Sequence, residues 1–208
     1  MSKDQVMKFY NAAAPSPRRV RIFLAEKNLE LPRDDLDLQQ GATRTPEFLA
    51  KNSLGGTPVL ELDDGTILTE SVAICRYIES MHPAPPLMGA DELNAAKVEM
   101  WNRRMEIEIF ATLANIAQHT FDFFADKLEQ VPAFAEAQKR MAVKKWQWLE
   151  GELADGRPFI AGDRFSIADI TGMAALMVGD FVGVEIPTSL GHVNNWNDSV
   201  RSRASWDA

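Results

Sequence analysis

The chain has 208 residues, 46% of them hydrophobic and 25% charged, which is typical of a globular protein with a sizeable core. The formal net charge of −8 argues against binding to nucleic acid or to an anionic membrane surface. No apolar run approaches the ~18 residues of a membrane-spanning helix, and the N-terminal residues show no secretory signal pattern. The single cysteine, Cys75, excludes an internal disulfide and fits a reducing compartment, so we expect a cytoplasmic protein.

The first 82 residues alternate between strand and helix patterns. Ser16 is a good N-cap and Pro17 suits the first helical position, so a helix should begin there. Asp63-Asp64-Gly65 between two apolar runs predicts a hairpin. The expected elements are a strand at 6–10, a helix from 16, a strand at 33–38, a short helix at 45–53, the two hairpin strands and a helix at 71–80. This βαβ-α-ββα order predicts a mixed four-stranded sheet.

The composition changes after residue 82. Three prolines and a glycine in residues 81–89 cannot continue a helix, so we expect a linker at 83–89 between domains at 1–82 and 90–208. The second domain should be all-helical. Apolar residues recur at steps of three and four along one long helix that ends at His119, and a second helix should cover 133–154. Ser166, with Asp169 three residues later, predicts a capping box before a buried third helix, and a last helix should cover 190–200.

An α/β domain followed by a proline-rich linker and an all-α domain resembles the soluble glutathione transferases. The resemblance rests on four stretches in this order: SPRRVRIFLAEKNL, TPEFLAKNSLGGTPVLELDDGTILTES, AICRYIE and RPFIAGDRFSIADI. APSPRRVR and RRMEIEIF…QHT are most similar to an atypical fungal and bacterial branch that lacks the usual catalytic Tyr, Ser or Cys. The resemblance implies a thioredoxin-like first domain and glutathione as co-substrate.

Thr57-Pro58 opens an apolar strand, where proline is unusual because it cannot donate a ladder hydrogen bond. The resemblance implies a cis bond here, with Gly56 before it, that presents the backbone of Thr57 to an extended peptide such as glutathione. The alternative is that Pro58 only blocks edge pairing.

Glu70-Ser71 stands where the next helix should begin. Helix N-terminal amides and the Ser71 hydroxyl suit a carboxylate, and Glu70 suits an ammonium group, as in the γ-glutamyl end of glutathione. The alternative is a plain N-cap with a solvated Glu70. At the glycine end of glutathione, many relatives use a basic residue or histidine, and Arg44 falls near that place.

The residue that activates the thiol is open between two candidates. Ser16 is the only hydroxyl in the loop after the first strand, and a hydroxyl at a helix start can stabilise a thiolate as well as cap the helix. The atypical branch instead implies a water held by a histidine of the helical domain, which here is His119. The serine that accompanies this histidine in the branch is missing from TFDFFADK.

These features predict a glutathione transferase that conjugates glutathione to hydrophobic electrophiles and forms a homodimer, with no metal site. The weak activating loop leaves open a non-catalytic binding or regulatory protein of the same family. Glutathione-dependent peroxide reduction at the same site is a further alternative.

Overall fold

The computed structural model describes residues 7–208, so Val6 of the first predicted strand lies outside the described residues. The chain divides into two compact units. One ends at Pro86 and includes the final Asp207–Ala208, and the other comprises Leu87–Trp206. The division falls inside the predicted linker at 83–89. Within the described residues, no helix is long and apolar enough to cross a membrane.

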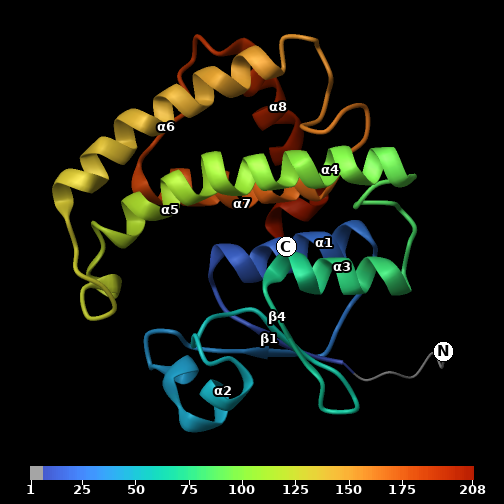
Figure 1. The fold of residues 1–208 in the computed structure, drawn as a ribbon, viewed down its shortest axis with the longest axis vertical. Helices are drawn as coiled ribbons and strands as arrows, with labels where there is room; N and C mark the ends of the chain where they lie inside the picture. The colour runs from blue at the N-terminus through green and yellow to red at the C-terminus, as the bar shows by residue number, and fades with distance from the viewer. Residues whose placement is uncertain (1–6) are drawn as a thin grey trace. The chain divides into compact units, whose positions relative to one another are not determined.

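The first unit has the predicted order of elements. They are β1 (Lys8–Asn11), α1 (Pro15–Glu26), β2 (Arg33–Asp35), the short 3-10 helix η1 (Ala42–Arg44), α2 (Pro46–Lys51), β3 (Val59–Glu61), β4 (Ile67–Thr69) and α3 (Ser71–Met81). The sheet order is β2-β1-β3-β4, with β1 parallel to β2 and antiparallel to β3. The predicted mixed four-stranded sheet and thioredoxin-like domain are confirmed. Helices α1 and α3 cover one face of the sheet and α2 the other (Figure 1).

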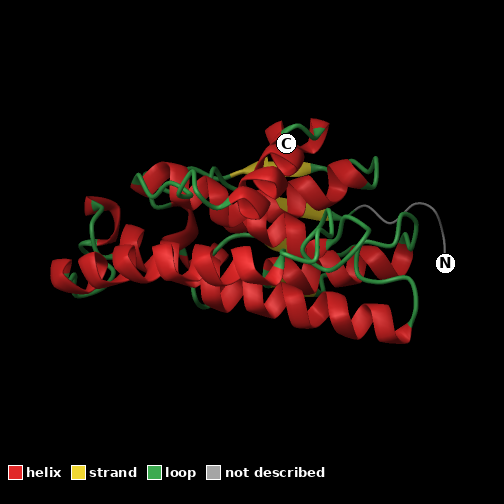
Figure 2. Ribbon diagram, turned by 90° about the horizontal axis from the view of Figure 1, so that it is seen from above, coloured by secondary structure: helices red, strands yellow, loops and turns green. Residues whose placement is uncertain are grey.

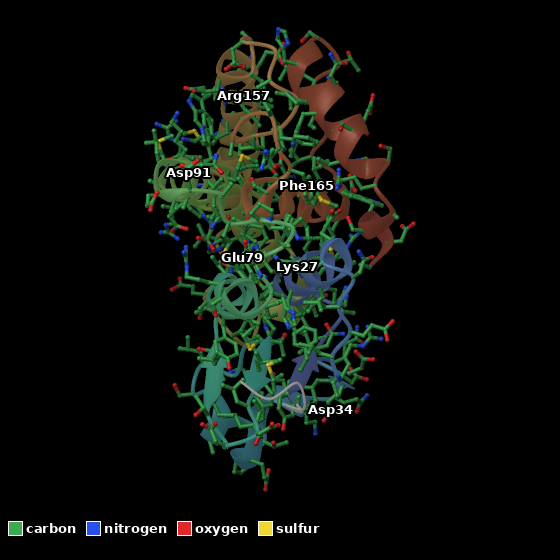
Figure 3. All side chains as sticks on the ribbon, turned by 90° about the vertical axis from the view of Figure 1, so that its right-hand side faces the viewer. Lys27, Asp34, Glu79, Asp91, Arg157 and Phe165 are labelled. Atoms are coloured by element: carbon green, nitrogen blue, oxygen red, sulfur yellow. The ribbon has the colours of Figure 1, made fainter. Side chains whose placement is uncertain are left out.

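Successive side chains of β1 point to opposite faces of the sheet, and each face is covered by its own helices. Phe9 is completely buried, and Tyr10 points to the opposite face, where its ring meets Phe48 of α2 edge-on at 6.1 Å. On the other layer, Lys27 at the end of α1 forms a buried ion pair of 2.7 Å with Glu79 of α3 (Figure 3). The Lys27 ammonium also donates to the carbonyls of His82 and Pro85, so one side chain fastens α1, α3 and the segment after α3.

The start of α1 differs from the prediction. The helix begins at Pro15, so Ser16 is its second residue rather than its N-cap. Ala14 precedes the proline in an extended conformation, with φ −146° and ψ 159°, as expected for a residue before proline. Pro15 takes the first helical position that the sequence analysis gave to Pro17.

The second unit is helical apart from its loops, and the strands are confined to the first (Figure 2). Its helices are α4 (Glu92–Arg104), a π-helical segment η2 (Met105–Phe110), α5 (Ala111–Gln118), the 3-10 turn η3 (Asp122–Phe124), α6 (Pro132–Glu152), α7 (Ile167–Val182) and α8 (Gly191–Arg201). The 3-10 helix η4 (Ala204–Asp207) begins in this unit and ends at Asp207 of the first. The predicted all-helical architecture is confirmed. The predicted long helix is correct in its buried stripe, but it contains the π segment, which its periodicity did not reveal.

Helix α7 is the buried centre of the second unit, as predicted, and the capping box at its start is present. The Ser166 side chain accepts from the amide of Ala168, while Asp169 accepts from the amide of Ser166. Asp169 also accepts from the amide of Ile160 at 2.9 Å and from Nε1 of Trp196 at 3.0 Å. One buried carboxylate therefore connects α7 to the preceding loop and to α8.

Candidate functional site

Strand register brings three chain segments to one end of the sheet. Tyr10, Val59 and Thr69 form one row across β1, β3 and β4. The next row beyond it consists of Asn11, Pro58 and Glu70, where β1 and β4 end and β3 begins. The loop that leads to Ser16, the Thr57-Pro58 pair and the Glu70-Ser71 pair therefore meet at the same end.

The segment before β3 carries the backbone geometry that the resemblance implies. The Thr57-Pro58 peptide bond is cis. The loop in front of it is held by Asn52, whose amide donates to the carbonyl of Gly56 at 2.8 Å and whose oxygen accepts from the amide of Leu54 at 3.2 Å. Asn52 is nearly buried, so the approach to Thr57 has a fixed shape.

Glu70 has an unusual backbone. It is the N-cap of α3 with φ 66° and ψ 115°, and its side chain makes no capping hydrogen bond. A non-glycine residue at positive φ costs on the order of 1–3 kcal/mol, and such residues concentrate at functional sites. The exposed Glu70 carboxylate is thus kept at the start of a helix without being used to cap it.

The Ser71 hydroxyl accepts a hydrogen bond from a buried arginine. Arg19 of α1 donates from Nη1 to Oγ of Ser71 at 2.6 Å, and both side chains are buried, with 2% and 4% of their surface exposed. Because the Ser71 oxygen accepts this bond, its own hydrogen is free to be donated to an anion. The arginine charge favours an anion at the same place.

Ser16 lies in the first turn of α1 between two prolines rather than at the predicted N-cap. Prolines occupy the first and third helical positions of α1, and neither has an N–H group. Ser16 therefore supplies the amide of this helix start as well as a hydroxyl, and its side chain is partly exposed. Arg21 anchors the preceding loop by donating to Oδ1 of Asn11 at 2.6 Å and to the carbonyl of Ala12 at 3.1 Å.

Arg44 lies at the end of η1 beside the loop before Thr57. Its Nη1 donates to the carbonyl of Leu54 at 3.3 Å, and the side chain is exposed. Gly55 makes this approach possible, because a Cβ there would lie 2.6 Å from Nη1 of Arg44 and its φ is 61°. The guanidinium is therefore attached to the Thr57 loop.

His119 belongs to the second unit, at the C-terminal cap of α5. Its Nδ1 accepts from the amide of Val131 at 3.0 Å, and its ring packs edge-on against Phe134 at 5.0 Å. A neutral imidazole that accepts at Nδ1 carries its proton on Nε2. His119 is thus arranged to donate from Nε2 rather than to act there as a base.

Neither Cys75 nor Tyr10 is available as a reactive group at this site. Cys75 is fully buried in α3, and burial raises the pKa of its thiol far above the usual range, so it is not a nucleophile. The Tyr10 hydroxyl donates to Glu61 at 2.6 Å on the α2 face. Within residues 7–208, no group of three or more His, Cys, Asp or Glu side chains is arranged to hold a metal.

Comparison with known proteins identifies the family. Residues 14–81 match the family described as "Glutathione S-transferase, N-terminal domain", and residues 132–196 match "Glutathione S-transferase, C-terminal domain". The chain belongs to the glutathione S-transferase family. The family and fold predicted from the sequence are therefore confirmed.

Similar proteins also support the predicted branch of this family. Glutathione S-transferase 2 of Saccharomyces cerevisiae is 34% identical over 207 residues, covering 98% of this chain and 88% of the relative. The solved structure of a glutathione S-transferase domain-containing protein of Marinobacter aquaeolei is 36% identical with a TM-score of 0.89, covering 96% of this chain and 99% of the other. That of a class Gtt2 glutathione S-transferase of Vibrio parahaemolyticus is 31% identical with a TM-score of 0.83, covering 97% and 96%.

Sequence reasoning about this glutathione S-transferase missed three supporting residues. Arg19, Asn52 and Gly55 contact the predicted positions Ser71, Gly56 and Arg44. Arg19 is one of three arginines in RRVR, and the sequence alone does not distinguish it from the other two. Its burial depends on which side of α1 packs against the rest of the unit. Gly55 is half of a Gly-Gly pair, a signal that could have indicated a backbone at positive φ, as observed at 61°.

Proposed function

We propose that this protein conjugates glutathione to hydrophobic electrophiles and that Glu70, Ser71, Thr57 and Arg44 hold the peptide. The enzyme class and the co-substrate, both predicted from the sequence, are confirmed by the family and its named transferases. The residue roles and the class of acceptor are the proposal. The single observation that carries the roles is the exposed Glu70, held at positive φ directly before a Ser71 that Arg19 supports.

The γ-glutamyl end of glutathione is an α-amino acid head with one ammonium and one carboxylate. Glu70 receives the ammonium, since its carboxylate is exposed at the end of β4. The amides at the start of α3 and the Ser71 hydroxyl receive the carboxylate, because an 11-residue helix presents unpaired N–H groups and a positive dipole end there. The Arg19 charge behind Ser71 adds to this preference.

The rest of the tripeptide is positioned by the neighbouring loops. The backbone of Thr57 pairs with the cysteinyl residue in the manner of an added strand. Arg44 receives the terminal glycine carboxylate, which a guanidinium binds well because its N–H groups match the two oxygens. The cysteinyl thiol then lies toward the end of β1 and the start of α1.

Ser16 stabilises the thiolate in this proposal. A free thiol has a pKa of about 8.5, so most of it is protonated at neutral pH. The Ser16 hydroxyl and amide donate to the sulfur at the positive end of α1, which lowers the thiol pKa. The thiolate attacks the electrophilic carbon of the acceptor and forms a carbon–sulfur bond. In a substitution the leaving group departs with the electron pair of the broken bond, and in an addition the acceptor takes up a proton. A water held by Nε2 of His119 is the competing activator.

Calorimetric titration tests the γ-glutamyl site most directly. Wild-type protein is titrated with glutathione and with the dipeptide Cys-Gly, which lacks the γ-glutamyl group. We expect one-site glutathione binding and at least about 100-fold weaker Cys-Gly binding, which corresponds to about 2.7 kcal/mol. Glu70→Gln should weaken glutathione binding about tenfold. Glu47→Gln, which removes an exposed carboxylate from the first turn of α2, serves as the matched control.

The outcome separates the competing functions. Equal binding of the two peptides, or no effect of Glu70→Gln, would overturn the site assignment. Turnover of a halonitrobenzene or an epoxide identifies a conjugating enzyme, and turnover of an organic hydroperoxide identifies the peroxidase. Binding without turnover of either class identifies the regulatory protein.

Homodimerisation and a cytoplasmic location complete the proposal. Both are supported by membership of the family. Sedimentation that shows only monomer at micromolar concentration would contradict the dimer.

A further inference from the structure

A chain of hydrogen bonds leads from the exposed end of β2 to the loop that precedes Ser16. Asn11, the last residue of β1, is 6% exposed and pairs in the sheet with Asp35 of β2. Its Nδ2 donates to Oδ1 of Asp35, and its Oδ1 accepts from Nη1 of Arg21 at 2.6 Å. Because a carboxylate only accepts and a guanidinium only donates, these two charges fix the orientation of the Asn11 amide.

Arg21 continues this chain into the loop. The same Nη1 donates to the carbonyl of Ala12 at 3.1 Å, and that carbonyl also accepts from the amide of Ala14 at 2.8 Å. The bond between the two alanines closes a three-residue turn, which sets the direction in which the chain leaves β1. The next residue, Pro15, is already the first of α1. The turn therefore determines where Ser16 lies.

The loop has no polar side chain of its own with which to hold this turn. Residues 12–14 are all alanine, and Ala12 is 1% exposed. The only side chain reported to donate to a carbonyl of these three residues is that of Arg21, which comes from the second turn of α1. Within residues 7–208, the geometry of the loop thus depends on one arginine that lies outside it.

The charge of Arg21 is only weakly compensated. The side chain is half-buried, and the carboxylate of its network, Asp35, forms its ion pair with Arg33 instead, at 3.1 Å. Burial and the neighbouring charges of Arg18 and Arg33 lower the pKa of Arg21, and Asp35 offsets this only in part. An arginine nevertheless stays charged at neutral pH. A cation near a thiol favours the thiolate, so this charge acts in the same direction as Ser16.

We propose that Arg21 is a positioning residue of the transferase, which holds the turn at 12–14 so that the hydroxyl and amide of Ser16 are directed at the glutathione sulfur. This inference rests on the proposed function, in which Ser16 stabilises the thiolate. Arg21 contacts neither the sulfur nor the acceptor in this role. It should therefore control the reactivity of bound glutathione and not the affinity for it.

Arg21→Met tests this role, because it keeps much of the side-chain volume and removes both hydrogen bonds. With a halonitrobenzene as acceptor, we expect kcat to fall at least about tenfold while KM for glutathione stays within about twofold. The pKa of the bound thiol, measured from thiolate absorbance in the ultraviolet, should rise by about one unit. Thermal unfolding and calorimetry with glutathione establish that the variant is folded and saturated.

Two further variants separate position from charge. Arg33→Met is the matched control, because it removes an exposed arginine but leaves the bond between Asp35 and Asn11 in place. It should change neither kcat nor the thiol pKa. Arg21→Lys keeps the charge without the planar guanidinium and should restore only part of kcat. It also carries the test if Arg21→Met does not fold, since a partial loss of kcat is expected on the same grounds.

The outcomes distinguish this inference from the function on which it rests. A wild-type protein that binds no glutathione would overturn the proposed function and this inference with it. Wild-type turnover that Arg21→Met leaves unchanged would overturn this inference alone. So would an Arg21→Met variant whose KM rises while the thiol pKa stays constant, an equal loss of kcat in Arg33→Met, or full activity in Arg21→Lys.

Discussion

Arg19 and Ser71 join the N-terminal parts of α1 and α3, two helices that are far apart in the sequence of the first unit. Nη1 of Arg19 in α1 lies 2.6 Å from Oγ of Ser71 in α3, and both side chains are buried. The bond holds the serine hydroxyl in one orientation at the start of α3. It also couples the loop that carries Ser16 to the helix start that follows Glu70, so the two halves of the proposed site share one buried contact.

Arg19→Met should weaken glutathione binding, because it removes the donor that holds the Ser71 hydroxyl. A hydrogen bond involving a charged group contributes about 1.5–3 kcal/mol, which predicts roughly a 10- to 150-fold loss of affinity. Calorimetry measures this loss, and thermal unfolding reports any accompanying loss of stability.

The neighbouring Arg18→Met is the matched control, because it removes the same charge from a less buried position on the same helix. If both variants lose affinity equally, net charge rather than the Arg19–Ser71 contact explains the effect. Arg19→Lys keeps the charge but not the planar guanidinium, and we expect it to restore only part of the affinity.

Glu70→Gly should separate stability from binding. Glycine adopts positive φ without the steric cost of a Cβ, so the variant relieves the strain at φ 66°. It also removes the carboxylate proposed to bind the ammonium group. We therefore expect the free energy of unfolding to be unchanged or to rise by up to about 1 kcal/mol, while glutathione affinity falls about tenfold.

Glu70→Ala completes this comparison. It removes the same carboxylate but keeps a Cβ at positive φ, so it should lose affinity without gaining stability. Urea unfolding and calorimetry on the three proteins distinguish the effects. A Glu70→Gly variant that is markedly less stable than Glu70→Ala would contradict the strain argument.

Ser16→Ala and His119→Gln distinguish the two activators of the thiol. If Ser16 stabilises the thiolate, Ser16→Ala should raise the pKa of bound glutathione and lower kcat at least tenfold, with little change in KM. His119→Gln should then leave the pH profile in place. Thiolate absorbance in the ultraviolet measures the pKa directly.

The reverse pattern would assign the role to the water held by His119. In that case His119→Gln shifts the pH profile and Ser16→Ala does not. Ser16→Cys provides a further check, because a thiol at the same position retains a weak donor and should retain part of the activity.

The sequence predicted the fold well because its signals were local and mutually consistent. Proline and glycine positions, the hairpin turn at Gly65 and the capping box at Ser166 each concern contacts within a few residues. Which face of α6 is buried does not follow from its large apolar residues. Phe134 and Met141 are 39% exposed on this helix, whereas Ala135 and Ala142 are buried, because small residues allow its close packing.

The site was predictable only where the family pattern named a residue. Glu70 and Ser71 were expected, but the positive φ of Glu70 and the bond from Arg19 depend on how α1 and α3 pack against the sheet. The shift of the α1 start from Ser16 to Pro15 has a similar origin, since two prolines both fit the first turn and only the loop geometry selects between them.

Asp169 should make the stability of this protein depend on pH in a direction opposite to that of most acidic residues. Its carboxyl is fully buried, and burial raises its pKa to about 6 even though amide and indole donors favour the ionised form. The folded state therefore holds the proton more tightly than the unfolded chain, whose aspartate pKa is about 3.9.

The stabilising contribution is complete below about pH 4 and is lost as the pH rises through 6. Relative to Asp169→Asn, which does not titrate, the wild-type free energy of unfolding should fall by up to about 3 kcal/mol between pH 4 and pH 7. Urea unfolding of both proteins at fixed protein concentration across this range measures the difference. A difference that grows with pH instead would mean that the donors from Ile160, Ser166 and Trp196 outweigh burial and keep the carboxylate ionised.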